Sequence, residues 1–122
     1  MLMENPVTAL SFTKDSKFLA SGSQSGKIKI WRVFSGLCVN RLENAHDQCI
    51  NCIMFSKDNK QLFTGSTDGL IRLHSLTSGN MLKQFCGHTS FVNSICYADD
   101  FHNLVSSSSD GTVKIWSIKN ND

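Results

Sequence analysis

Short runs of alternating apolar and polar residues recur along this chain at a fixed spacing. One five-residue sequence motif occurs three times, 43 and then 42 residues apart, as Lys27–Trp31, Leu70–His74 and Thr112–Trp116. A turn-forming pair precedes each copy, namely Ser25-Gly26, Asp68-Gly69 and Asp110-Gly111. Runs of this length, rich in β-branched and aromatic residues and bounded by Gly, Asn, Asp and Ser, predict strands. A repeat of about 40 residues predicts stacked supersecondary units.

Each unit is predicted to contain three strands and to continue into a fourth. The predicted strands are Val7–Phe12, Phe18–Ser23, Lys27–Val33 and Leu37–Leu42; Ile50–Phe55, Gln61–Ser66, Leu70–Leu76 and Met81–Cys86; and Val92–Ala98, Asn103–Ser108 and Thr112–Ile118. Asp-Gly favours the type I′ hairpin turn, which needs positive φ at both central residues. Asp99-Asp100 is predicted to mark the first hairpin of the third unit.

Four-stranded sheets that repeat every 40 to 45 residues are typical of β-propeller blades. We therefore expect an all-β fold of three consecutive blades: residues 1–43, 44–86, and 87–122, the last without its outer strand. Known propellers have 4–8 blades, so three blades predict an incomplete propeller. We expect such a piece to belong to a longer protein or to self-associate.

Composition narrows the class of protein. The chain has 122 residues, 40% of them hydrophobic, and a net charge of +2, which argues against disorder and does not by itself indicate nucleic acid. No apolar run reaches the ~18 residues that a membrane helix needs. Five cysteines without a secretory signal predict reduced thiols in the cytosol or nucleus.

The repeated phrases resemble the WD40 repeat family. The Gly-His element of that family appears as Gly87-His88 and, altered, as Ala45-His46, while Trp31-Arg32, His74-Ser75 and Trp116-Ser117 stand for its Trp-Asp element. Within the family, the amino-acid sequence is most similar to that of the Smu-type splicing factors. The segments in which this similarity lies are Gly26–Trp31, Gly87–Asn93 and Ser106–Trp116.

The resemblance implies a buried structural tetrad in each blade. In such repeats the Gly-His histidine, a second-strand Ser or Thr, the turn Asp and the third-strand Trp form a hydrogen-bonded chain. The positions that match are His88, Ser106, Asp110 and Trp116; His46, Thr64 and Asp68, with His74 in the Trp place; and only Ser21 and Trp31 in the first repeat. Since Ser25 replaces the turn Asp there, blade one is expected to be the least tightly tied.

Three alternative interpretations accompany these residues. Ser106, His88 and Asp110 have the residue types of a nucleophilic triad, but the structural chain is favoured and no enzyme is expected. Cys49 and Cys52 have metal-ligand spacing and Cys86-Gly-His88 could complete a site. Residues three apart on a strand point to opposite faces, so apolar fillers are favoured over zinc, and no cofactor is expected. His74 could be a ligand or switch residue, although a substituted core position is favoured.

A weakly basic stripe is predicted along the third strands. Its members are Lys27, Lys29, Arg32, Arg72 and Lys114. Because no stacking aromatic residues are interleaved with them, a solvated blade edge is favoured over direct RNA binding.

A partner-binding face is also implied by the resemblance. In WD40 propellers the narrow face is lined by residues that flank the apolar residue opening each first strand, and by the residue before the turn Asp. Here these are Pro6, Thr8, Gln24, Cys49, Asn51, Thr67, Phe91, Asn93 and Ser109. Phe91 is the one aromatic residue among them and could be a contact hot spot or a local plug beneath the Gly-His loop.

The function that follows is non-catalytic protein–protein scaffolding. The Smu-type resemblance implies a nuclear role in pre-mRNA splicing, among spliceosomal components and the partner protein RED. In that family the RED contact belongs mainly to an N-terminal region that this sequence lacks, so this stretch need not bind RED. The alternative is a WD40 scaffold of another assembly, such as a ubiquitin-ligase substrate receptor.

Overall fold

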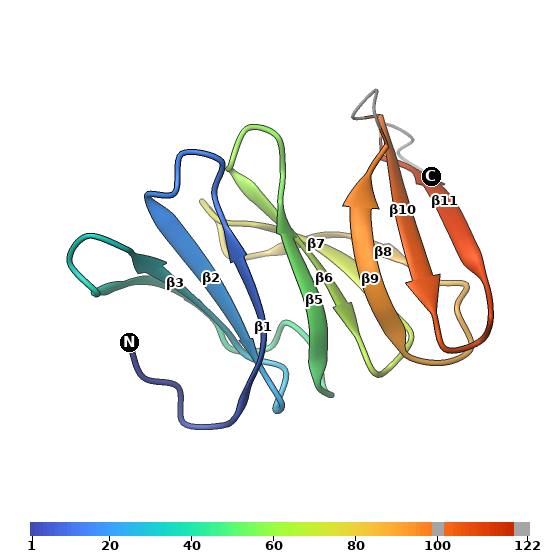
Figure 1. Ribbon diagram of the computed structural model, residues 1–122, viewed down its shortest axis with the longest axis horizontal. Helices are drawn as coiled ribbons and strands as arrows, with labels where there is room; N and C mark the ends of the chain where they lie inside the picture. Colours follow the sequence, from blue (N-terminus) through green and yellow to red (C-terminus); the bar gives the residue numbers. More distant parts are fainter. Residues whose placement is uncertain (99–101, 119–122) are drawn as a thin grey trace.

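A computed structural model describes residues 1–98 and 102–118, and within them the chain forms only β-strands and turns (Figure 1). The predicted hairpin residues Asp99 and Asp100, and the tail from 119 to 122, lie outside the described residues. The expectation of an all-β fold is confirmed.

Three antiparallel sheets follow one another along the chain. Blade one consists of β1 (Val7–Phe12), β2 (Phe18–Ser23), β3 (Ile28–Arg32) and β4 (Cys38–Leu42), in that order. Blade two consists of β5 (Ile50–Phe55), β6 (Gln61–Ser66), β7 (Ile71–Ser75) and β8 (Met81–Phe85). Blade three consists of β9 (Val92–Tyr97), β10 (Asn103–Ser108) and β11 (Val113–Ser117). Each sheet thus keeps the chain order that hairpin connections produce.

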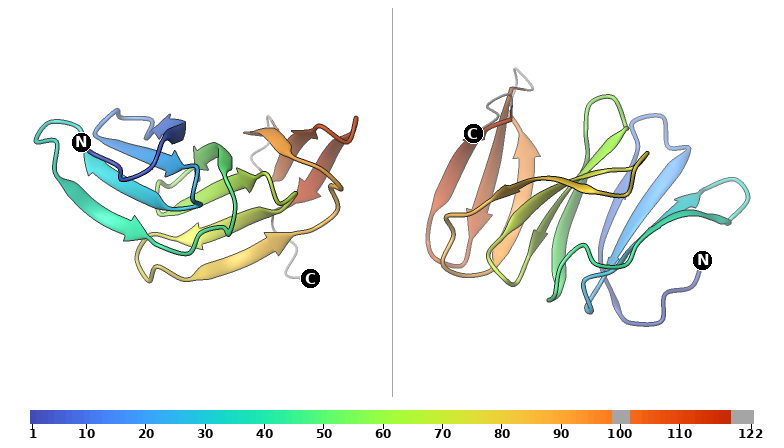
Figure 2. Two further views of the ribbon diagram at one scale, coloured as in Figure 1. Left: turned by 90° about the horizontal axis from the view of Figure 1, so that it is seen from below. Right: turned by 180° about the vertical axis from the view of Figure 1, so that it is seen from behind.

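The blades fan out along an arc. Figure 2 shows β1, β5 and β9 on the concave side of this arc, with β4 and β8 on the outer side. The described residues form an unclosed arc, in which blade two is packed between blade one and blade three.

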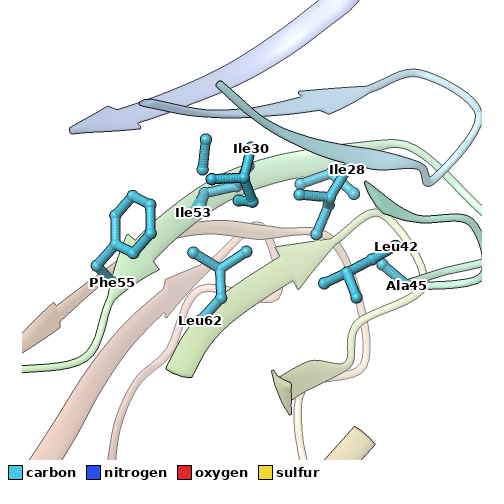
Figure 3. Close-up of a cluster of buried hydrophobic side chains, with 9 residues drawn as sticks. Ile28, Ile30, Leu42, Ala45, Ile53, Phe55 and Leu62 are labelled. Carbon is cyan, nitrogen blue, oxygen red and sulfur yellow. The ribbon is translucent and has the colours of Figure 1, made fainter. Parts of the chain in front are cut away.

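Apolar side chains fill the two spaces between the blades. The cluster between blades one and two contains Ile28, Ile30, Ile50, Ile53, Phe55 and Leu62 (Figure 3). The cluster between blades two and three contains Phe63, Ile71, Leu73, Val92, Ile95 and Leu104. Both faces of blade two are therefore covered, which is why its strands carry apolar residues on both sides.

The outer faces of blades one and three are uncovered among the described residues. Leu10 of β1 is 61% exposed, whereas Ile53, its counterpart in β5, is 8% exposed. Ile115 of β11 is 71% exposed, whereas Ile30, its counterpart in β3, is 4% exposed. The same sequence pattern is thus buried or exposed according to whether a neighbouring blade is present.

The hairpin turns between the second and third strands differ from the prediction. Gly26, Gly69 and Gly111 have positive φ, but Asp68 and Asp110 are not among the non-glycine residues with positive φ. The expected type I′ geometry is therefore wrong. In the turn of blade two, Gly69 N–H donates to the carbonyl of Ser66 at 3.1 Å, as in a tight turn closed by a left-handed glycine.

Candidate functional site: a hydrogen-bonded scaffold beneath an interaction face

In blade three, four side chains from four separate segments form one hydrogen-bonded chain. His88 Nδ1 donates to Asp110 Oδ2 at 3.0 Å, and Ser106 Oγ donates to His88 Nε2 at 2.7 Å. Trp116 Nε1 donates to Ser106 Oγ at 2.8 Å. The hydroxyl of Thr112, then the N–H of Thr89 and the His88 ring, hold the pKa of Asp110 well below its usual range. The chain joins the loop before β9 to β10, the turn after it and β11.

The triad interpretation of these residues conflicts with their burial. Ser106 is 1% exposed, and its oxygen lies between the His88 ring and the Trp116 indole. A nucleophile must reach a substrate carbonyl, and this hydroxyl is enclosed by its own partners. The arrangement therefore fits a structural tie between strands.

Blade two has the same chain with a histidine at its end. His46 Nδ1 donates to Asp68 Oδ2 at 3.0 Å, and Thr64 Oγ1 donates to His46 Nε2 at 2.7 Å. His74 Nε2 lies 3.2 Å from Thr64 Oγ1, where the blade-three indole would be. Burial, together with the charges of His46 and Arg72, lowers the pKa of His74 to about 4. Burial also lowers the pKa of His46, against the opposing effect of Asp68. Both rings are therefore neutral at pH 7.

Blade one has a different hydrogen-bonded chain, of which the sequence predicted only Ser21 and Trp31. Trp31 Nε1 donates to Ser21 Oγ at 2.9 Å, and Ser21 Oγ donates to Met3 Sδ at 3.3 Å. Asn5 Nδ2 donates to Ser25 Oγ at 3.1 Å. Met3 thus takes the place of the histidine, a role that sequence reasoning missed because a thioether carries no polar signature. A thioether is a weak acceptor, so this tie is weaker than the other two.

Packing explains why the residue before each tetrad histidine differs. A Cβ atom added to Gly87 would lie 2.8 Å from the Trp116 ring, closer than such atoms approach in proteins. Ala45 occupies the matching position in blade two and is fully buried, but there the smaller His74 replaces the indole. Gly with Trp, and Ala with His, are therefore two solutions to one packing constraint.

Three of the six residues predicted to flank the opening of the inner strands, one in each blade, lie at strand irregularities. The register of each inner strand shifts around Thr8, Asn51 and Asn93. Such a bulge re-aims the side chain of the extra residue. Asn51 Nδ2 donates to the carbonyl of Val92 in the next blade at 3.0 Å, and the Thr8 hydroxyl donates to the carbonyl of Ile50. Two of these residues thus join neighbouring blades, a role that sequence reasoning did not anticipate.

The remaining residues of the predicted face cluster on the same hairpins. Ser109 N–H donates to the carbonyl of Phe91 at 2.9 Å, and Asn93 Nδ2 donates to Ser109 Oγ at 3.0 Å. The Phe91 side chain is 50% exposed. In the other two blades, Gln24 N–H donates to the carbonyl of Pro6 and Thr67 N–H donates to that of Cys49. Phe91 is accordingly a half-exposed aromatic ring on a loop held by backbone and side-chain hydrogen bonds.

Structural contacts account for Cys52 and for two residues of the basic stripe, Lys29 and Arg72. The bulge at Asn51 interrupts the strand alternation that would place Cys49 and Cys52 on opposite faces. Cys52 packs on the second cluster, and burial raises the pKa of its thiol to about 12. Among residues 1–98 and 102–118, no group of three or more His, Cys, Asp and Glu is placed to hold a metal ion.

In the basic stripe, Lys29 Nζ donates to the carbonyl of Leu2 at 3.2 Å, and Arg72 Nη1 donates to that of Ala45 at 2.9 Å.

The described part of the chain contains no helix long and apolar enough to cross a membrane.

Comparison with known proteins identifies the family to which the repeats belong. The family model described as "WD domain, G-beta repeat" matches residues 3–32, 36–75 and 79–117. Two solved structures cover the whole chain: "Crystal structure of RRP9 WD40 repeats", 28% identical with a TM-score of 0.90, and "Structure of U3-55K", 27% identical with a TM-score of 0.91. The chain spans 38% and 39% of their lengths. The family match covers most of the sequence and the folds agree, so this chain belongs to the WD40 repeat family.

Proposed function

We propose that this chain is part of a non-catalytic scaffold that presents its narrow face to a protein partner in the pre-mRNA splicing machinery of the nucleus. Protein binding is the general role of WD40 repeats, and the splicing assignment rests on the phrases that resemble Smu-type factors. The observation that carries the proposed contact is the exposed ring of Phe91 beside the hydrogen-bonded pair Asn93 and Ser109.

The surroundings of Phe91 support a contact more than a plug. A plug would be covered by the loop it supports, yet half of the Phe91 surface is open to solvent. Asn93 and Ser109 offer short donors and acceptors next to this ring without a charge to desolvate. An aromatic anchor among small polar groups is the usual anatomy of an interface hot spot.

Affinity purification of the protein tagged at its chromosomal locus tests this proposal. Phe91→Ala should weaken recovery of splicing proteins about fivefold, equivalent to about 1 kcal/mol, while the melting temperature stays near that of the wild type. Phe34→Ala is the matched control, because Phe34 is a fully exposed phenylalanine in a turn at another site. Equal recovery from the two variants, or a wild-type sample without splicing proteins, would contradict the proposal.

A further inference from the structure

A cavity of about 180 Å³ lies between blades one and two, beside the His74 ring. One wall comes from the end of β4 and the segment after it, with Arg41, Glu43 and Asn44. The other wall comes from β7, the following turn and β8, with His74, Gly79 and Met81. A cavity of ~150 Å³ can hold a benzene molecule, so this space accommodates the end of one side chain.

The hydrogen bonds of blade two determine which nitrogen of His74 carries the proton. The Asp68 carboxylate can only accept, so His46 Nδ1 carries a proton and His46 Nε2 is an acceptor. Thr64 must then give its single hydroxyl proton to His46 Nε2. Its oxygen is left to accept from His74 Nε2. His74 is therefore the Nε2–H tautomer, and its Nδ1 presents a lone pair.

The His74 ring lines the cavity. The His74 residue is 3% exposed, and the ring has no hydrogen bond at Nδ1 to any described residue. Within the described part of the chain, no enclosed side-chain nitrogen or oxygen lacks a hydrogen-bond partner. Nδ1 is therefore not enclosed, and the cavity is the open space that the ring lines. Because burial keeps the pKa of this ring near 4, the lone pair persists at neutral pH.

This acceptor is a consequence of the substituted tetrad. In blade three the only polar atom of Trp116 donates to Ser106, so the indole has nothing left to offer a ligand. In blade two the imidazole makes the equivalent bond with one nitrogen and keeps the second free. Ala45 fills part of the space that a larger ring would occupy.

The charges around the cavity favour an uncharged donor. Arg41 and Glu43 line it with opposite charges, and Glu43 lies 3.7 Å from Lys27 Nζ. Arg72 already acts on His74 as a neighbouring positive charge, which disfavours a cationic guest. A group that donates to His74 Nδ1 and accepts from the Arg41 guanidinium would form hydrogen bonds with both walls of the cavity.

We propose that this cavity binds a neutral primary amide, the side chain of an Asn or Gln residue in a partner protein. The amide N–H₂ donates to His74 Nδ1 and its carbonyl accepts from Arg41. Naming a protein as the source of the amide rests on the interaction role proposed above. The recognition chemistry is independent of that role, so the two can fail separately.

The test uses acetamide as the probe and the purified full-length protein with ¹⁵N-labelled histidine. The His74 spectrum should show the Nε2–H tautomer, and the Nδ1 signal should shift saturably as acetamide is added. N,N-dimethylacetamide keeps the carbonyl but has no N–H, and should leave that signal unmoved. The His88 signals serve as an internal control, because both nitrogens of that ring are engaged in blade three.

Two variants complete the test. His74→Phe removes the acceptor and should abolish the binding seen by calorimetry, whereas Leu82→Ala, at an exposed position on β8, should bind as the wild type does. If His74→Phe does not fold, Arg41→Met should weaken acetamide binding about fivefold. Three results would overturn the proposal: an Nδ1–H tautomer of His74, an equal shift of the Nδ1 signal with both probes, or no shift of that signal when acetamide is added. A failure of Phe91→Ala to affect partner recovery would not bear on these results.

Discussion

At the scale of single residues, the replacement of a tryptophan by His74 changes both packing and protonation in blade two. Two neutral imidazoles, His46 and His74, share the Thr64 hydroxyl in a buried site. The identities of these residues could be assigned from the repeat spacing. The placement of their protons could not be assigned, because it depends on hydrogen bonds among four side chains that include the Asp68 carboxylate.

The two histidines make the stability of the fold sensitive to acid. Their folded-state pKa values are lowered from the ordinary value of 6.5, to about 4 for His74. The unfolded chain therefore binds more protons than the folded one below pH 6.5. The stabilisation is fully present above pH 6.5 and is lost as the pH falls toward 4. For His74 alone the loss should be about 1–2 kcal/mol at about pH 5.

Replacing His74 by Trp separates packing from protonation. The single variant His74→Trp should lose roughly 1–3 kcal/mol by overpacking against Ala45, since even one Cβ atom at Gly87 would crowd the Trp116 ring. The double variant His74→Trp with Ala45→Gly should recover this loss and show a smaller decrease in stability at about pH 5. Urea unfolding at about pH 7 and about pH 5 provides the comparison. A double variant no more stable than the single one would show that the pairing of ring and small residue is incorrect.

At the scale of elements, the strands were predictable and the links between blades were not. The observed strands agree with the predicted runs to within about one residue at each end, because each run alternates and is bounded by turn residues. Thr8 and Asn51 were predicted as surface residues of a recognition face. They reach the next blade because a register shift at each position re-aims the side chain, and a bulge leaves no clear mark in a single sequence.

The bulged asparagines provide a matched pair of variants. Asn51 donates across the blade boundary to the Val92 carbonyl, whereas Asn93 bonds Ser109 within its own blade at an exposed site. Asn51→Ala should therefore lower the free energy of unfolding by about 1 kcal/mol, and Asn93→Ala by less than about 0.5 kcal/mol. Amide hydrogen exchange in β9 should increase only in the first variant. Equal effects would mean that the Asn51 link does not hold the blades together.

At the scale of the whole molecule, the uncovered faces of blades one and three dominate the behaviour of these 122 residues in isolation. Leu10 and Phe12 are exposed on one face, and Val113 and Ile115 on the other. Apolar patches of this kind promote association. Two copies joined head to tail would bring six blades into one ring, within the known range of propellers.

We accordingly expect residues 1–122, expressed alone, to form a dimer or larger aggregates at micromolar concentration. Light scattering coupled to size exclusion measures this directly. Val113→Lys combined with Ile115→Lys should shift the population toward monomer, whereas Leu82→Lys, at another exposed apolar position, should not. A sharp wild-type monomer peak with cooperative unfolding would show that the two faces need no cover.

Site-specific photo-crosslinking can show whether the narrow face around Phe91 contacts a protein partner. In cells, p-benzoylphenylalanine replaces Phe91 in one sample and the fully exposed Phe34 in another. We expect a discrete protein adduct from position 91 that includes a splicing component, and no comparable adduct from position 34. Adducts that are the same from both positions, or absent at position 91 in a folded protein, would contradict this expectation.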